Sequence, residues 1–383
     1  MPVNHPRFID QLSQLVSTPS VSCTQASLDM GNRNVIDLLA NWLKPMGFNV
    51  EILPLAQKGK ANLIATLGEG DKGLVFAGHT DTVPYDQDRW QQDPFRLKID
   101  DNRAFGLGAT DMKGFFPTVL AAIQPFLNKP LKQPIILLAT ADEETSMSGA
   151  RALVNQRQPK AAYAVIGEPT GMRPIRMHKG ITMESIRIQG QAGHSSNPSL
   201  GNNALDVMHD VISELKQFRQ QLQQSHQHTG FTIEVPTLNL GCIHGGDNPN
   251  RICGHCELEF DIRPLPGMSL DNLREDIDKI LDQIAEQKNI AIQRECLFSG
   301  VDAFEQEKNS PLIQQVEKLT QQQAGSVAFA TEAPFLQALG MDVVVMGPGS
   351  IDQAHQPDEF IDLSEIDFAV KTLQGLIHQF CIK

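Results

Sequence analysis

The chain has 383 residues, more than one ordinary hydrophobic core holds, and this length predicts two domains. Apolar residues make up 41% and charged residues 20% of the chain, a balance that excludes a disordered protein. The 45 acidic residues outnumber the 32 Lys and Arg, so the formal net charge is −13, which argues against a nucleic acid or an anionic membrane as partner.

Other features of the chain favour a cytoplasmic protein. The N-terminal residues lack the basic and apolar regions of a signal peptide, and no apolar stretch approaches the length of a membrane span. Six cysteines spread along the chain fit a reducing compartment. Cys253 and Cys256 form a lone CxxC in an extended segment, where this spacing sends the side chains to opposite faces, so we expect no zinc or redox site there.

The first part of the chain predicts alternating strands and helices. In chain order we expect helices at 6–16 and 33–45, strands at 48–54, 61–67 and 73–78, a hairpin at 95–107, a helix at 113–127, a strand at 135–140, a helix at 147–156 and a strand at 162–166. This alternation predicts an α/β fold with a mixed, largely parallel sheet flanked by helices.

The pattern changes near residue 179. The following segments read as strand 181–191, helix 202–224, strands 237–244 and 251–263, helix 269–287 and strand 290–298, an order βαββαβ that is typical of ferredoxin-like domains. The chain then continues with helix 310–322, a short strand at 326–330, strand 342–346 and helix 364–379. We therefore predict a large domain made of 1–178 and 299–383, with a small domain, 179–298, inserted into it.

Five apolar runs of the large domain lead into short loops that carry His, Asp or Glu. These loops contain His79-Thr-Asp81, Asp111-Met-Lys-Gly, Asp142-Glu143-Glu144, Glu168-Pro and, late in the chain, His355. Open α/β sheets bind ligands just beyond the carboxyl ends of their strands. Two His and several carboxylates gathered there would form a site for two divalent metals.

Each loop taken alone has an ordinary alternative. His79 could be a simple loop histidine, Asp111 could cap a helix, and the Asp142–Glu144 acids could be a solvated cluster. Adjacent acids after an apolar strand nevertheless repel one another unless a cation or proton intervenes, and one can bind a metal while the next acts as general base. Asp81, two residues after His79, is positioned to support a metal-bound histidine. Together the five loops favour zinc or cobalt.

These motifs resemble those of the M20 family of co-catalytic zinc peptidases and deacylases, nearly from end to end. Further matching segments are Met177–Gly180, Gly193–Ser196, Asn250–Ile252, Asp261–Pro266, Thr331–Phe335 and Gly347–Asp358. One departure is Ala109-Thr110 before Asp111, where Ser or Cys is expected. The resemblance implies a deacetylase of arginine biosynthesis that hydrolyses N2-acetyl-L-ornithine to L-ornithine and acetate.

Other functions stay open at this point. A desuccinylase of succinyl-diaminopimelate or a broader N-acyl-amino-acid hydrolase would use the same metals, and a dipeptidase fits less well. A binding protein on an inactive enzyme scaffold is disfavoured because Glu143 and all five ligand positions are present. A dinucleotide enzyme is disfavoured because no G-x-G-x-x-G opens an early helix.

The resemblance also assigns roles in the metal site. It implies two Zn2+ ions, with Co2+ as the alternative, one ion held by His79 and Glu168 and the other by Glu144 and His355. It further implies that Asp111 bridges the two ions. By the same resemblance, Glu143 is the general base and Asp81 supports the site.

The remaining expectations concern the inserted domain, for which the resemblance implies a role as lid and homodimer interface. His194 would reach the partner's active site as an oxyanion donor; the alternative is a surface histidine. The substrate carboxylate needs a cation, and Arg251, beside Asn250, is favoured over Arg263, which could instead hold the lid. Glu332 is a candidate for the δ-ammonium of the substrate.

Overall fold

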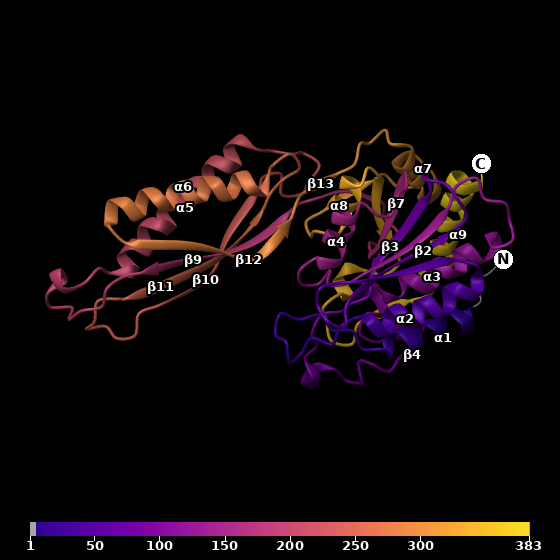
Figure 1. The fold of residues 1–383 in the computed structure, drawn as a ribbon, viewed down its shortest axis with the longest axis horizontal. Coiled ribbons are helices and arrows are strands. Elements are labelled where there is room, and N and C mark those ends of the chain that lie inside the picture. The colour runs from indigo at the N-terminus through magenta and orange to yellow at the C-terminus, as the bar shows by residue number, and fades with distance from the viewer. Residues whose placement is uncertain (1–4, 383) are drawn as a thin grey trace. The chain divides into compact units, whose positions relative to one another are not determined.

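The computed structural model describes residues 5–382, and its contacts divide the chain into two compact units (Figure 1). Unit 1 comprises the chain up to Arg176, Gln306–Gly325 and the chain from Thr331 onward. Unit 2 comprises Met177–Glu305 and Ser326–Ala330. Each unit has a hydrophobic core of its own. Among the residues described, no helix combines the length and apolar character that crossing a bilayer requires.

The main sheet of unit 1 is mixed, with parallel strands at its centre. Its order is β1-β2-β6-β3-β7-β15-β8-β13, with β14 paired to β8. The neighbours β6/β3, β3/β7 and β7/β15 are parallel, whereas β1 and β2 run antiparallel at one edge. The strands are β1 Asn49–Pro54, β2 Ala61–Leu67, β3 Leu74–His79, β6 Ile135–Thr140, β7 Tyr163–Pro169, β8 Ile175–His178, β13 Phe304–Glu305, β14 Gly325–Val327 and β15 Asp342–Gly347.

Helices cover this sheet because its central strands are apolar on both faces. Every residue of β3 and β6 is buried, as expected for parallel strands between two helical layers. The helices of unit 1 are α1 His5–Val16, α2 Arg33–Leu43, α3 Phe115–Ile123, α4 Ser148–Gln156, α7 Pro311–Thr320, α8 Ala333–Ala338 and α9 Ile366–Ile377. α3 packs against α9 and α1, while α4 packs against α8. The predicted α/β class with a largely parallel sheet is confirmed.

Two local details differ from the sequence prediction. The helix expected over 113–127 spans only Phe115–Ile123, because an irregular turn, Ala109–Lys113, precedes it and Pro125 follows it. The hairpin expected over 95–107 is reduced to β4 Lys98–Asp100 and β5 Arg103–Phe105. These strands join β16 Phe360–Asp362 in a small three-stranded sheet. The pairing of β5 with β16 therefore brings the segment that follows Phe105 next to the segment that follows His355.

Unit 2 has the predicted βαββαβ order. It consists of β9 Ile181–Gln189, α5 Ala204–Ser225, β10 Thr237–Gly245, β11 His255–Arg263, α6 Leu270–Lys288 and β12 Ala291–Val301. The sheet is antiparallel with the order β10-β11-β9-β12, and α5 and α6 lie along it (Figure 1). The apolar stripe of α5, from Val207 through Leu222, packs on the alternating apolar residues of β9 and β11.

A buried carboxylate joins the sheet of unit 2 to α6. Glu184 on β9 has no exposed surface. Arg274 of α6 donates to one of its oxygens at 2.8 Å, and Arg294 of β12 donates to the other at 2.7 Å. Two guanidinium groups thus compensate the desolvated negative charge, which would otherwise be costly.

We expect Glu184→Gln to lower the free energy of unfolding by about 3–5 kcal/mol, because the two arginines then lack their shared counter-charge. The measurement is urea unfolding followed by circular dichroism. Lys279→Ala, which removes one side of an exposed pair with Asp276, serves as control and is expected to leave the midpoint unchanged. Equal losses in the two variants would contradict the prediction.

Candidate metal centre

The predicted ligands of unit 1 meet at one edge of its sheet. His79 ends β3, Glu143 and Glu144 follow β6, and Glu168 lies near the end of β7. The order β6-β3-β7 makes these three strands parallel neighbours, so their carboxyl ends reach the same edge. Asp111 comes to this edge from the irregular turn before α3, and His355 comes from the loop before β16.

Asp111 lies between the two histidines. Its Oδ1 is 3.0 Å from Nε2 of His79, and its Oδ2 is 3.5 Å from Nε2 of His355. Glu168 Oε1 is 4.0 Å from the first imidazole, and Glu144 Oε1 is 3.0 Å from the second. The ligand atoms thus form two groups that share Asp111, and a third grouping joins His79 to Glu143 and Glu144.

The chemistry of these residues fits divalent metals. Imidazole nitrogens and carboxylate oxygens are the ligand types that zinc and cobalt accept. Glu168 Oε1 is buried and has no hydrogen-bond partner within residues 5–382. A bound cation would give this oxygen the partner that buried polar atoms normally have. Three carboxylates and two imidazoles in two overlapping groups match a pair of cations better than a single one.

The electrostatics of the cluster point the same way. Burial, followed by repulsion from neighbouring acids, raises the pKa of Glu168 and of Glu143 well above the usual range. Burial opposes ionisation of Asp111 as well, but hydrogen bonds from His355 and His79 hold its pKa below the usual range. Bonds to Asp111 and Glu144 raise the pKa of His355 to about 10. Protonated imidazoles thus balance the carboxylates, and metal ions would replace these protons.

The backbone around His79 selects the tautomer that a metal ligand needs. Its Nδ1 lies 2.9 Å from the carbonyl oxygen of Asp81, and because a carbonyl only accepts, Nδ1 carries the proton. Nε2, which faces Asp111 at 3.0 Å, is then the nitrogen available to a metal ion. Support of His79 was the role expected for Asp81, and its backbone carbonyl makes this contact. The Asp81 carboxylate instead accepts the N–H groups of Glu143 at 3.3 Å and Glu144 at 3.1 Å.

Two further buried charges near the ligands escaped the sequence analysis. Lys60 is 8% exposed and donates to Asp142 at 2.5 Å, and Asp142 adopts a φ of 61° directly before Glu143. Glu359 is 2% exposed and accepts N–H groups from the turn that carries Asp111. In the sequence Glu359 is one acid among several polar residues, and Lys60 simply precedes an apolar strand. Neither position shows a local pattern that predicts a buried charge.

In unit 2 the structure brings three predicted residues together. His194 and Arg251 face each other in an isolated antiparallel bridge, and the carbonyl of Asn250 accepts the N–H of Ser195. The N–H of Ser196 donates to Nδ1 of His194 at 3.2 Å, so Nδ1 is unprotonated and Nε2 carries the hydrogen. His194 is therefore an exposed N–H donor beside an arginine.

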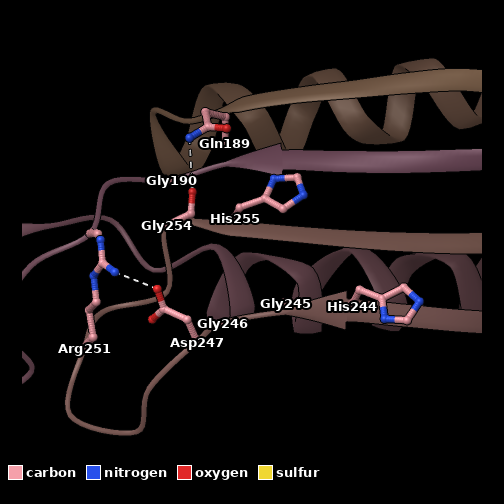
Figure 2. Close-up of a pocket in the computed structure, with 10 residues that line it drawn as sticks. Gln189, Gly190, His244, Gly245, Gly246, Asp247, Arg251, Gly254 and His255 are labelled. Atoms are coloured by element: carbon pink, nitrogen blue, oxygen red, sulfur yellow. Dashed lines mark hydrogen bonds and ion pairs between the residues drawn. The ribbon is translucent and has the colours of Figure 1, made fainter.

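Arg251 lines a cavity of about 530 Å³ in unit 2 (Figure 2). The cavity is bordered by the ends of β9, β10 and β11, with Gln189, His244 and His255 among its lining residues. Figure 2 shows the Arg251 guanidinium directed at Asp247, which accepts at 2.6 Å. The pair is exposed, so the guanidinium can exchange this partner for another carboxylate at little cost.

The other two predicted binding residues lie elsewhere. Arg263 ends β11, whereas Arg251 precedes the start of that strand, so the structure does not bring the two arginines together. Arg263 donates to Asp261 at 2.9 Å. Glu332, at the start of α8, is 2% exposed and accepts the Thr140 hydroxyl at 2.9 Å. Burial raises its pKa to about 7.

Comparisons of sequence and fold with known proteins point to one family. The profile described as peptidase family M20/M25/M40 covers residues 75–379. The acetylornithine deacetylases of Klebsiella pneumoniae (strain 342) and Edwardsiella ictaluri (strain 93-146) are 46% and 47% identical, over 99% of both chains and 98% of both chains respectively. An M20 family metallo-carboxypeptidase from Sulfolobus solfataricus has the same fold at a TM-score of 0.76, with 19% identity over 97% of this chain and 99% of that one.

The chain belongs to the M20 peptidase family. The resemblance to this family is thereby confirmed, and so is the prediction of a hydrolase with a metal site. The similarity to these two deacetylases extends over nearly the whole of each chain, and so over both units of this one.

The sharing of Asp111 by both ligand groups leads to a prediction for metal binding. We expect Asp111→Ala to remove high-affinity Zn2+ binding altogether, whereas Glu168→Ala retains one equivalent because the group of Asp111, Glu144 and His355 stays complete. The measurement is the metal content of chelator-treated protein after reloading and gel filtration. Two tightly bound equivalents in Asp111→Ala would show that the groups do not share this ligand.

Proposed function

We propose that the chain is a dinuclear zinc amidohydrolase that converts N2-acetyl-L-ornithine and water into L-ornithine and acetate, in the cytoplasm. The observation that carries the proposal is the complete set of two ligand groups around Asp111, with Glu143 beside them, in a chain 46% identical to an acetylornithine deacetylase. We assign His79 and Glu168 to one ion and Glu144 and His355 to the other. Co2+ is the alternative metal.

Two divalent cations at such a site acidify a water molecule and polarise the carbonyl of an amide substrate. The protein must then move one proton. Glu143 groups with His79 and Glu144 but belongs to neither of the two ligand groups that share Asp111, so its carboxylate stays available to take a proton. We propose that Glu143 takes the proton from water and passes it to the leaving amine. The C–O bond would form first, giving a tetrahedral intermediate, and the C–N bond would break as this intermediate collapses to acetate and the protonated leaving amine.

The negative oxygen of the tetrahedral intermediate needs a hydrogen-bond donor. We propose that Nε2–H of His194 supplies it, from the partner subunit of a homodimer formed through unit 2. The Ser196 N–H supports this role because it holds the tautomer with a hydrogen on Nε2. Asp81 would support the base, since it accepts the N–H of Glu143.

Arg251 and Asn250 are our assignment for the α-carboxylate of the substrate. Arg251 lies in a backbone bridge with His194, so one pair of loops would bring an oxyanion donor and a carboxylate-binding cation together. Arg263, at the far end of β11, is paired with Asp261 of the same strand, and holding the lid is the role that we assign to it instead. For Glu332, Oε1 has no partner in the described part of the chain and is the atom that we assign to the substrate ammonium.

A substrate panel tests the reaction. We expect zinc-loaded protein to hydrolyse N2-acetyl-ornithine faster than succinyl-diaminopimelate, acetyl-methionine or a dipeptide, with activity lost on chelation and restored by Zn2+. Release of the free amine is measured for each compound. Preference for the succinyl substrate would replace the proposal by a desuccinylase, and activity insensitive to chelator would exclude a metal mechanism.

Mixed subunits test the role of His194. We expect Glu143→Ala and His194→Ala each to lose at least ~100-fold in kcat, in line with the loss of a general base or an oxyanion donor. When the two inactive proteins are unfolded, mixed and refolded, some dimers contain one site with both residues intact, and partial activity returns. Self-mixed samples of each variant are the control. Absence of recovery in verified heterodimers would show that His194 acts within its own subunit.

A further inference from the structure

Glu359 is a buried carboxylate outside both ligand groups. It lies four residues after His355 and is 2% exposed. One of its oxygens accepts the N–H of Gly108 at 2.9 Å. The other accepts the N–H of Thr110 at 2.7 Å and that of Asp111 at 3.0 Å. A single side chain thus receives three backbone donors from the turn that carries the shared ligand.

This turn needs such a partner because its backbone is irregular. Gly108 has a φ of 77°, and Asp111 and Met112 have non-helical dihedral angles inside the Ala109–Lys113 turn. The N–H groups of Gly108, Thr110 and Asp111 therefore have Glu359 as acceptor in place of a regular helical ladder. Buried N–H groups without acceptors are costly, so loss of the Glu359 carboxylate would drive the turn to rearrange.

The same segment also carries His355, and other bonds attach it to the Asp111 turn. The Glu359 carbonyl accepts the N–H of Gly106 at 2.9 Å, and the Phe360 carbonyl accepts the Thr110 hydroxyl at 2.7 Å. β16 then pairs with β5. Two loops about 250 residues apart in sequence are thereby joined beside the point where Asp111 approaches His355.

We propose that Glu359 is a positioning residue that holds the Asp111 carboxylate at its place between His79 and His355, and thereby sets the affinity of the paired metal site. The proposal rests on the dinuclear site of the proposed function. Glu359 touches the backbone of Asp111 and acts through it, because its two oxygens are occupied by the three N–H groups. Partners that orient metal ligands typically change metal affinity 10–100-fold when they are removed.

The test is Glu359→Gln, which preserves size but replaces one acceptor oxygen by an amide nitrogen facing backbone donors. We expect Zn2+ binding 10–100-fold weaker than in the wild-type protein, by calorimetric titration of chelator-treated protein against a competing chelator. At limiting Zn2+ the variant should have a reduced kcat, because part of the protein lacks metal. At saturating Zn2+ its kcat should return close to the wild-type value, and its KM for the acetylated substrate should equal that of the wild-type protein. A general loss of folding would lower activity at every Zn2+ concentration and would therefore not be reversed by saturating Zn2+.

Glu184→Gln is the matched control, because it makes the same chemical change at a fully buried carboxylate of unit 2. It is expected to lower stability and to leave Zn2+ affinity at the wild-type value. Glu359→Asp retains the charge but shortens the side chain, and an intermediate affinity is expected. Circular dichroism of each metal-free protein verifies folding, and Glu359→Asp replaces Glu359→Gln if the latter does not fold.

The outcomes separate this proposal from the proposed function. Wild-type Zn2+ affinity in folded Glu359→Gln, or in folded Glu359→Asp if that variant must be used, would overturn the positioning role while leaving the hydrolase intact. An equal loss of affinity in Glu184→Gln would also overturn it, because the effect would then be one of general stability. A wild-type protein that binds two Zn2+ without hydrolysing acetyl-ornithine would refute the proposed function, and the affinity comparison would still decide the role of Glu359.

Discussion

Negative charge concentrated at one edge of a buried sheet is the constraint on which this structure depends. Asp111, Glu168 and Asp81 are at most 6% exposed, and Glu143 and Glu144 adjoin them. Carboxylates packed in this way repel one another and lose their hydration, which explains the raised pKa of Glu168 and Glu143. Protons or cations must compensate this charge, and two imidazoles alone offer at most two positive charges. The ligand set is thus arranged for divalent ions.

The loops that carry the ligands are held by acids that belong to neither group around Asp111. Asp81 accepts the N–H groups of Glu143 and Glu144, and Glu359 accepts those around Asp111. Asp142, directly before Glu143, accepts a hydrogen bond from the Lys60 ammonium group. The contacts of Asp81 and Glu359 hold backbone N–H groups, whereas the Lys60–Asp142 contact joins two side chains. Ligand carboxylates on such loops have their Cα positions determined before a metal arrives, which lowers the ordering cost of binding it.

The two units contribute different chemistry to the proposed reaction. The edge of the unit 1 sheet offers the candidate metal ligands and the proposed base, from the ends of β3 and β7 and from loops beside them. Unit 2 offers a hydrogen-bond donor, His194, and a cation, Arg251, on loops joined by a backbone bridge. The proposed hydrolysis of an amide substrate that carries a free carboxylate uses the groups of unit 1 to activate water and those of unit 2 to bind the oxyanion and the carboxylate. A chain with unit 1 alone would retain metal ligands but lack the groups proposed to bind the oxyanion and the carboxylate.

Sequence by itself was sufficient for the features that depend on side-chain type and local periodicity. Apolar strands ending in His79 or in Asp142-Glu143-Glu144 predicted a metal site at the carboxyl edge of a parallel sheet, and the strand and helix order predicted both folds.

Tertiary structure alone decided which atoms meet. It separated Arg251 from Arg263 by the length of β11, and it assigned the contact with His79 to the carbonyl of Asp81. It also revealed Glu359, whose partner Asp111 lies 248 residues away. Such contacts leave no local pattern, because they depend on how distant loops fold against one another.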